Sequence, residues 1–181
     1  MEIITDLEHI LSLSSNTASK TYRKGEIIQR PGSRISHPLY VKKGLLKSYL
    51  IDSKGKEHIY MFAPEGWIIG DIEAMEYQQE TELFIECLED SEVIVFDKNG
   101  LFNQNLNPQQ IVENTVLLKR RIGRLQRRVL MLMGTPAADR YEYFLKIYPD
   151  LINRVPQKLI ASYLGITAQT LSTIRSERAE K

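Results

Sequence analysis

The sequence predicts an α+β protein: an N-terminal antiparallel β-roll of the jelly-roll type, then a long helix, then a C-terminal helix-turn-helix. Three observations predict this fold class. Short runs rich in β-branched and aromatic residues fill the first part of the chain. At Pro108 the spacing of apolar residues becomes helical, and further on Gly165 divides two short amphipathic runs. The expected domains are the β-roll at 1–107, the long helix at 108–134 and the helix-turn-helix domain at 135–181.

Length and composition set the class of protein. A chain of 181 residues can bury the core of one large or two small domains, and its 43% hydrophobic and 26% charged residues are typical of a soluble globular protein. No apolar run is long enough to span a membrane, and the acidic start MEIITDLEHI predicts no signal peptide. We therefore expect a cytoplasmic protein. The single cysteine, Cys87, excludes an internal disulfide framework, and its alternating neighbours predict a buried, inert thiol.

The strands are expected where β-branched and aromatic residues gather between turn signals such as Pro31-Gly32 and Lys43-Gly44. Many short strands at close spacing favour an antiparallel sandwich or jelly roll. A short helix with Leu7 and Ile10 on one face is expected before them. The predicted strand runs are GEIIQ (25–29), PLYVKKG (38–44), LLKSYLI (45–51), EHIYMF (57–62), ELFIECL (82–88) and EVIVF (92–96).

The long helix carries a heptad seam, in which apolar and β-branched residues recur at alternating steps of four and three. Pro108 suits its first turn, and Gly134 suits the position after its end. β-Branched residues at a and mostly leucine at d favour two parallel helices, so we expect a homodimer. The alternative is a helix packed on its own domain. The expected dimer interface, called the dimer seam below, is Ile111, Thr115, Leu118, Ile122, Leu125, Val129 and Leu132.

Charge is divided unevenly along the chain. Residues 1–107 hold 11 Lys and Arg against 17 Asp and Glu, a net of −6, whereas residues 108–181 hold 13 against 6, a net of +7. The basic second part fits a polyanionic partner, although attraction between the two parts explains the division as well. The basic residues at 119–128 on the long helix are interpreted as a solvated face rather than as a DNA contact.

The stretch IASYLGITAQTLSTIR (160–175) has the features of a helix-turn-helix. Ile160, Ala161 and Leu164 fall on one side of a first helix, and Gly165 follows where a helix end needs a left-handed residue. Thr167 suits the N-cap of the second helix, whose Leu171 faces inward. The alternative is an ordinary helical hairpin in a core.

The outward face of the second helix is small or hydrogen-bonding, which suits insertion into a major groove. Gln169 is expected to pair with adenine, and Ala168 or Thr173 to touch a thymine methyl. The two threonines at 167 and 170 suit phosphates or capping, and the two arginines suit the DNA backbone. The candidate DNA-binding residues are Thr167, Ala168, Gln169, Thr170, Ser172, Thr173, Arg175, Ser176 and Arg178.

Taken together, the β-roll, long helix and helix-turn-helix resemble the Crp/Fnr superfamily of bacterial transcription regulators. The resemblance covers nearly the whole chain and rests on Lys24-Gly25-Glu26, LYVKKG (39–44), FAPEGWIIGD (62–71) and residues 160–175. It implies a homodimer that binds a near-palindromic double-stranded operator, with RNA polymerase as a further candidate partner. The resemblance also places an effector pocket in the β-roll, with Gly70, Asp71, Thr81 and Glu82 as its candidate residues.

The effector pocket departs from the pattern that the resemblance implies. Members that bind cyclic nucleotides hold the ribose with a glutamate and the phosphate with an arginine; here those positions are Asp71 and Thr81, the latter between Glu80 and Glu82. Carboxylates repel a phosphate, so we expect no tight cyclic AMP binding, no cofactor and an unknown effector. Four cysteines for an iron–sulfur cluster are missing, and scattered His9, His37 and His58 are weak candidates for a haem ligand.

Members of the family commonly place a β-hairpin wing after the second helix. Only six residues follow Arg175, so we expect no full wing; the alternative is that the sequence is part of a longer chain.

Two rival functions remain. One is a ligand-sensing roll that acts through protein partners and keeps a vestigial DNA-binding head. The other is a β-barrel metalloenzyme, for which the sequence lacks clustered ligands, so we expect no enzyme and no metal site.

Overall fold

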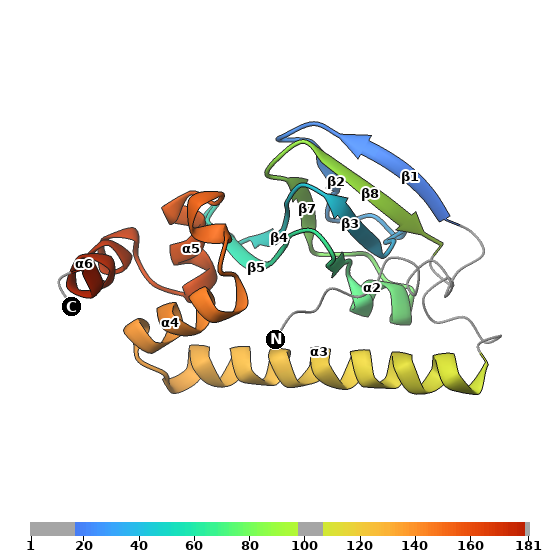
Figure 1. Cartoon of the computed structure of the whole chain (residues 1–181). Helices are drawn as coiled ribbons and strands as arrows, with labels where there is room; N and C mark the ends of the chain where they lie inside the picture. Colours follow the sequence, from blue (N-terminus) through green and yellow to red (C-terminus); the bar gives the residue numbers. More distant parts are fainter. Residues whose placement is uncertain (1–16, 98–106, 180–181) are drawn as a thin grey trace. The chain divides into compact units, whose positions relative to one another are not determined.

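The structure, a computed structural model, describes residues 17–97 and 107–179 (Figure 1). It consists of two compact units divided between Asn107 and Pro108. The first unit is an antiparallel β-roll and the second is helical, so the predicted fold class is confirmed. None of the described helices is both long and apolar enough to cross a bilayer.

The β-roll is built from two four-stranded antiparallel sheets, with strand orders β1-β8-β3-β6 and β2-β7-β4-β5. One short helix, α2 (Ile72–Tyr77), lies between β6 and β7. The strands are β1 (Thr17–Tyr22), β2 (Ile27–Gln29), β3 (Leu39–Lys43), β4 (Leu46–Ile51), β5 (Glu57–Ala63), β6 (Ile68–Ile69), β7 (Phe84–Cys87) and β8 (Ser91–Phe96).

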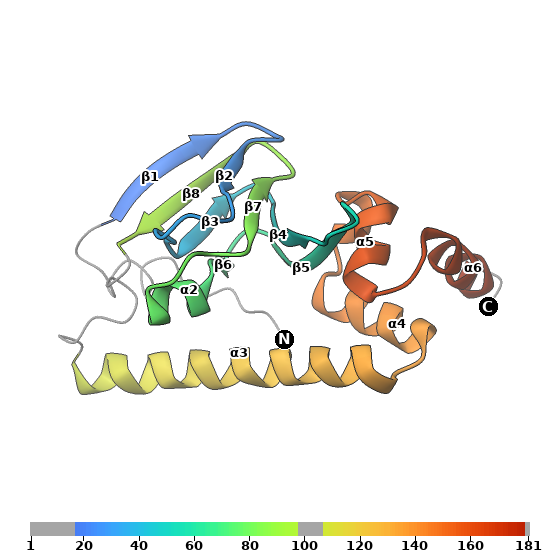
Figure 2. The ribbon, with the colours of Figure 1, turned by 180° about the vertical axis from the view of Figure 1, so that it is seen from behind.

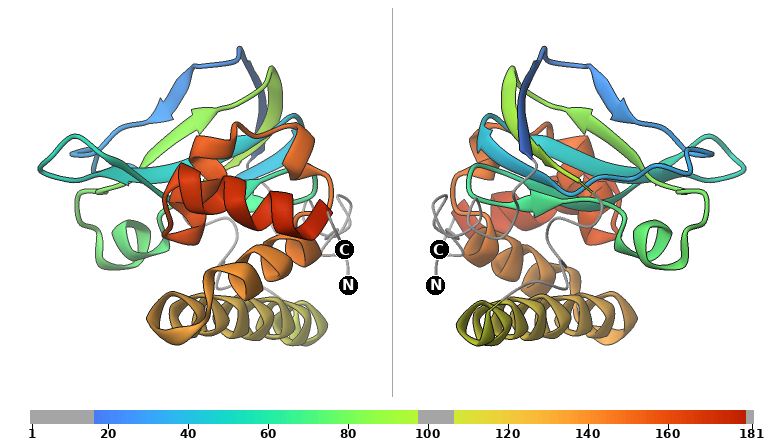
Figure 3. Two further views of the ribbon diagram at one scale, coloured as in Figure 1. Left: turned by 90° about the vertical axis from the view of Figure 1, so that its left-hand side faces the viewer. Right: turned by 90° about the vertical axis from the view of Figure 1, so that its right-hand side faces the viewer.

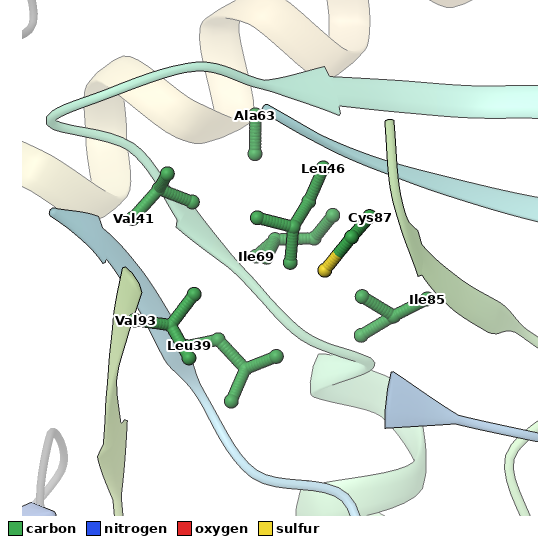
Figure 4. Packing of buried hydrophobic residues seen from close by; sticks show 8 residues of the cluster. All are labelled: Leu39, Val41, Leu46, Ala63, Ile69, Ile85, Cys87 and Val93. Atoms are coloured by element: carbon green, nitrogen blue, oxygen red, sulfur yellow. The ribbon is translucent and has the colours of Figure 1, made fainter. Parts of the chain in front are cut away.

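The core of the roll lies between the two sheets. Because side chains alternate along a strand, every second residue points inward, and Figure 4 shows these side chains pointing toward one another. Cys87 is fully buried among them, as predicted, and this burial raises the pKa of its thiol to about 11. The thiol therefore stays protonated at neutral pH. The cluster is Leu39, Val41, Leu46, Ala63, Ile69, Ile85, Cys87 and Val93.

All six predicted strand runs are strands in the structure, but the sequence did not predict β1, β6 or α2. The residues of β1, TASKTY, are mostly polar and exposed, and this strand forms only because β8 pairs with its whole length. Helix α2 has six residues, too few for a periodic signal. The predicted helix around Leu7 lies outside the described residues.

The turn between β4 and β5 is organised by one carboxylate. His58 Nε2 donates to Asp52 Oδ2 at 2.8 Å, and the backbone N–H groups of Lys54 and Lys56 donate to Oδ1. The His58 hydrogen bond, followed by the backbone N–H of Lys56, lowers the pKa of Asp52 to about 2.

The depressed pKa of Asp52 has a measurable consequence. Its folded-state pKa lies below the unfolded value of about 3.9, so its contribution to stability is present above about pH 3.9 and is lost as the pH falls through about 2. We expect carbon-13 NMR titration of the Asp52 carboxyl to give a midpoint near 2, and His58→Ala to move it toward 3.9. An unchanged midpoint in the variant would contradict this account.

The helical unit begins with the long helix α3 (Pro108–Gly134), and Figure 2 shows three shorter helices grouped near its C-terminal end. In the end-on views of α3 in Figure 3, these helices lie on one side of its axis. Tyr141, Phe144, Ile160, Leu164 and Leu171 are fully buried among them. The remaining elements are α4 (Ala137–Ile147), the 3₁₀ turn η1 (Leu151–Asn153), α5 (Gln157–Leu164) and α6 (Ala168–Ala179).

Every residue of the dimer seam is exposed in the single chain. Ile122 and Val129 are 63% and 55% exposed, whereas branched apolar residues are among those most often buried. Within the helical unit the seam is therefore largely uncovered, and only its last residue, Leu132, approaches the turn at Gly165. An exposed apolar stripe of this kind marks an interaction surface, and its pairing with a second copy stays a prediction.

Candidate nucleic-acid interface and effector site

The turn between α5 and α6 has the geometry of a helix-turn-helix. Gly165 ends α5 with φ 65° and ψ 35°, the left-handed region in which a side chain is strained. The N–H of Ile166 donates to the Ala161 carbonyl at 3.0 Å, which satisfies a carbonyl at the helix end. A Cβ at Gly165 would lie 3.1 Å from Leu132 Cδ2, so the turn also packs closely on α3.

Helix α6 is fixed at its start by the predicted cap. Thr167 Oγ1 accepts a hydrogen bond from the Thr170 N–H at 3.0 Å, and the two hydroxyls are 2.8 Å apart. Leu171 is fully buried and Ile174 half-buried, so these two side chains hold α6 on the unit. Thr167 therefore has a structural role as the N-cap of α6. The polar residues on the exposed face of α6 take no part in this cap.

The opposite face of α6 is exposed and polar. The structure brings together on it five of the nine candidate DNA-binding residues: Ala168, Gln169, Ser172, Thr173 and Ser176. The Thr173 hydroxyl donates to the Gln169 carbonyl at 3.2 Å. A helix with one anchored apolar side and one exposed hydrogen-bonding side has the form that fits a major groove.

The two arginines of α6 lie away from this face. Arg175 is half-buried, and Arg178 Nε donates to Glu142 Oε1 of α4 at 2.7 Å, a surface ion pair. Sequence reasoning did not anticipate this pairing, because Glu142 lies 36 residues away and on another helix. A surface pair of this kind contributes little to stability, so a phosphate can compete for Arg178.

The basic residues of α3 are not uniformly solvated, which corrects the interpretation from sequence. Arg128 lies over the ring of Tyr163 with its guanidinium carbon 3.8 Å from the ring centroid, and Arg127 lies 5.5 Å from that of Tyr143. Arg124 is half-buried, and this burial lowers the pKa of its guanidinium. Lys119 and Arg120 keep exposed side chains, as the interpretation expected.

Two of the four candidate effector residues, Asp71 and Thr81, belong to a buried hydrogen-bond network of the roll. Thr81 Oγ1 donates to Asp71 Oδ2 at 2.5 Å and accepts from Gln29 Nε2 at 3.0 Å. Gln29 Oε1 in turn accepts from Ser36 Oγ at 2.8 Å. Asp71 Oδ1 accepts from the Ala74 N–H at 3.1 Å and so caps α2. Both carboxylate oxygens of Asp71 therefore have donors within the chain.

All four side chains of this network are at least nine-tenths buried, and Thr81 is only 2% exposed. Gly70, beside it, packs closely as well, since a Cβ there would lie 3.1 Å from the His37 carbonyl oxygen. Sequence reasoning found Asp71 and Thr81 but missed Gln29 and Ser36. Gln29 is the polar last residue of strand β2, after two isoleucines, which was the one available signal.

An open cavity of about 460 Å³ adjoins this network and shares Thr81 with it. Glu82 lines it with an exposed side chain, and Glu80 pairs there with Arg34 at 3.3 Å. Its walls combine these carboxylates with exposed Leu50 and Ile51. The cavity is lined by Pro31, Gly32, Leu50, Ile51, Glu80, Thr81, Glu82 and Phe84.

The histidines of the described residues have other partners. His37 Nδ1 donates to the Phe96 carbonyl at 3.0 Å, and His58 pairs with Asp52. Within 17–97 and 107–179, no three His, Cys, Asp or Glu side chains are grouped to hold a metal ion. His9 lies outside these ranges.

Comparisons with known proteins agree with this architecture. Residues 19–104 match the family model described as the cyclic nucleotide-binding domain. The structure of FixK2 from Bradyrhizobium japonicum is similar with a TM-score of 0.73 and 20% identity, over 90% of this chain and 84% of that chain. A CRP/FNR family transcriptional regulator from Thermus thermophilus has a TM-score of 0.65 and 17% identity, over 90% and 86%.

A curated relative, electron transport regulator A of Shewanella oneidensis, is 27% identical over 172 residues. The match covers 86% of this chain and 66% of the relative, so this chain spans slightly less than two thirds of that protein.

Proposed function

We propose that this chain is a homodimeric, sequence-specific DNA-binding transcription regulator of the Crp/Fnr type. Its residues 19–104 match the cyclic nucleotide-binding domain, and its fold is similar to that of Crp/Fnr regulators. It acts in the cytoplasm as a regulator and not as an enzyme. The observation that carries this proposal is the pairing, on one helical unit, of an exposed polar helix face on α6 with an exposed apolar seam on α3.

The mechanism is geometric. Two copies paired along the dimer seam present two α6 helices related by a two-fold axis. Such helices enter successive major grooves about 34 Å apart, so the operator is a near-palindrome with fixed spacing. Arg175 and Arg178 contact the DNA backbone at the edge of each helix, where Arg178 exchanges Glu142 for a phosphate. RNA polymerase is the further partner through which bound dimer acts on transcription.

Selection of preferred sites from random DNA tests this function directly, at a stated salt concentration because phosphate contacts depend on it. We expect a palindrome whose half-sites are centred about one helical turn apart. Enrichment of single, unpaired half-sites, or of no sequence, would refute the proposal.

The effector of the roll is not cyclic AMP. Asp71 and Thr81 are used by the internal network, and the adjoining cavity presents the Glu82 carboxylate beside a Glu80 carboxylate that pairs with Arg34. A phosphate that enters this cavity meets the Glu82 carboxylate, which repels it. We expect isothermal titration with cyclic AMP to show no binding tighter than the millimolar range. Micromolar affinity would contradict this expectation.

Gln169 is the residue proposed to read a base. We expect Gln169→Ala to reduce discrimination at one operator position by about 1–3 kcal/mol and to leave binding to unrelated DNA nearly unchanged. Competition gel shifts with single-base operator variants measure this. Gln157→Ala, the same substitution at an exposed position of α5 outside this face, is the matched control. Equal weakening on all DNA would contradict a base-reading role for Gln169.

The second candidate function is a ligand-sensing roll that acts through protein partners. The network and the open cavity of the roll are compatible with it, but it leaves the exposed polar face of α6 without a use. A gel shift with DNA from upstream of the protein's own gene separates the two functions.

A further inference from the structure

Helix α3 has a second face besides the dimer seam, and this face packs against the rest of its own unit. Its members recur at helical steps of three, four and three: Arg121, Arg124 and Arg128 are half-buried and Met131 is buried. The neighbours of Met131 in sequence, Leu130 and Leu132, remain exposed. Three of the four members of this face are therefore arginines, and the neighbouring Arg127 and Leu132 add contacts with Tyr143 and with the turn at Gly165.

The aromatic partner of this face is anchored on its other side. Tyr163 of α5 contacts Phe144 and Tyr148, with ring centroids 5.6 Å and 5.7 Å away. Phe144 and Tyr148 are themselves in contact and are both buried. Tyr163 thus belongs to the aromatic core of the helix-turn-helix unit, and the Arg128 guanidinium over its ring joins α3 to that core.

A second set of contacts lies at the turn before α6. Leu132 of α3 approaches the position of a Gly165 Cβ to 3.1 Å, and Arg140 Nη1 of α4 donates to the Leu164 carbonyl at 2.7 Å. A small cavity of about 10 Å³ lies between α3 and these helices, where Arg128, Leu132 and Tyr163 are among the residues that line it. The turn at Gly165, which positions α6, is therefore in contact with both α3 and α4.

We propose that the Arg128–Tyr163 contact fixes the angle between the long helix α3 and the helix-turn-helix unit, and so sets the half-site spacing that a dimer accepts. The inference depends on the proposed function. Arg128 and Tyr163 are positioning residues: both act through the orientation of α6, and neither belongs to its exposed polar face. Adding one base pair between half-sites moves the second groove by about 3.4 Å and about a tenth of a turn, so a rigid dimer rejects it.

The test compares spacing discrimination, which is the ratio of affinities for the selected palindrome and for the same palindrome with one base pair added or removed. Full-length Arg128→Gln and Tyr163→Leu are expected to reduce this ratio about fivefold or more, because each removes a cation–π contact from both protomers. Tyr163→Phe keeps the ring and should retain the wild-type ratio. Arg120→Gln removes the same charge from an exposed position of α3 and is the matched control.

A ratio is the appropriate measure because partial unfolding of a variant lowers both affinities equally and leaves the ratio unchanged. If Arg128→Gln keeps the ratio of Arg120→Gln while the wild type prefers one spacing, the positioning role is refuted and the proposed function stands. If the wild type binds no operator, or binds all spacings equally, the proposed function fails and this inference fails with it.

Discussion

Leu125→Glu is expected to convert the protein to a monomer and to abolish operator binding. Leu125 occupies a d position of the dimer seam, and its side chain is exposed in the single chain. In a parallel pair the two substituted side chains meet across the seam. Each protomer then loses about 2 kcal/mol of apolar burial, and two carboxylates are brought together without water. We expect the dimer dissociation constant to rise at least about thousandfold.

Leu130→Glu is the matched control for this substitution. Leu130 lies on the same helix, is also an exposed leucine and does not belong to the dimer seam. Glutamate is a good helix former, so neither variant should unfold α3. Sedimentation equilibrium and gel shifts at one salt concentration measure both variants. Equal behaviour of the two, or a monomeric wild type, would show that the seam does not pair two copies.

The elements that could be predicted from the sequence are those in which apolar residues recur at a regular spacing. The strands of the roll core were predicted because inward and outward residues alternate in runs such as Ser91–Phe96. The long helix was predicted to within one residue of its end because its apolar pattern continues along its whole length. Strand β1 and helix α2 escaped prediction for different reasons. The pairing of β1 with β8 is not visible in a short window of sequence. Helix α2 has six residues, too few for a periodic signal, and its Asp71 cap is a local signal that the sequence analysis did not use.

The candidate DNA-binding site and the candidate effector site also differed in how much of each could be predicted from the sequence. The turn at Gly165 and the cap at Thr167 are local interactions over a few residues, so the sequence predicted both. The buried network joins Gln29 to Thr81, 52 residues apart, and the Arg128–Tyr163 contact joins α3 to α5. Partners of this kind are chosen by tertiary packing, and an arginine-rich helix face gives no sign of which aromatic rings it will cover.

Thr81→Val should destabilise the β-roll by about 2–4 kcal/mol, although valine nearly preserves the shape of the side chain. The Thr81 hydroxyl donates to the Asp71 carboxylate and accepts from Gln29 Nε2 and from the Leu83 N–H. Valine removes these bonds while Asp71 and Gln29 stay buried. A hydrogen bond to a charged group is worth about 1.5–3 kcal/mol, and a buried donor left without its acceptor adds a further penalty.

Thr81→Ser separates the hydroxyl from the methyl group of the same residue. Serine keeps the hydrogen bonds and loses one buried methyl, so its cost should be about 1 kcal/mol. Urea unfolding followed by the fluorescence of Trp67, the one tryptophan of the chain, reports on the roll in which it lies. A larger loss for valine than for serine means that hydrogen bonds hold these loops closed around Asp71. Equal losses would mean that packing holds these loops closed and that the hydrogen bonds of the Thr81 hydroxyl contribute little to stability.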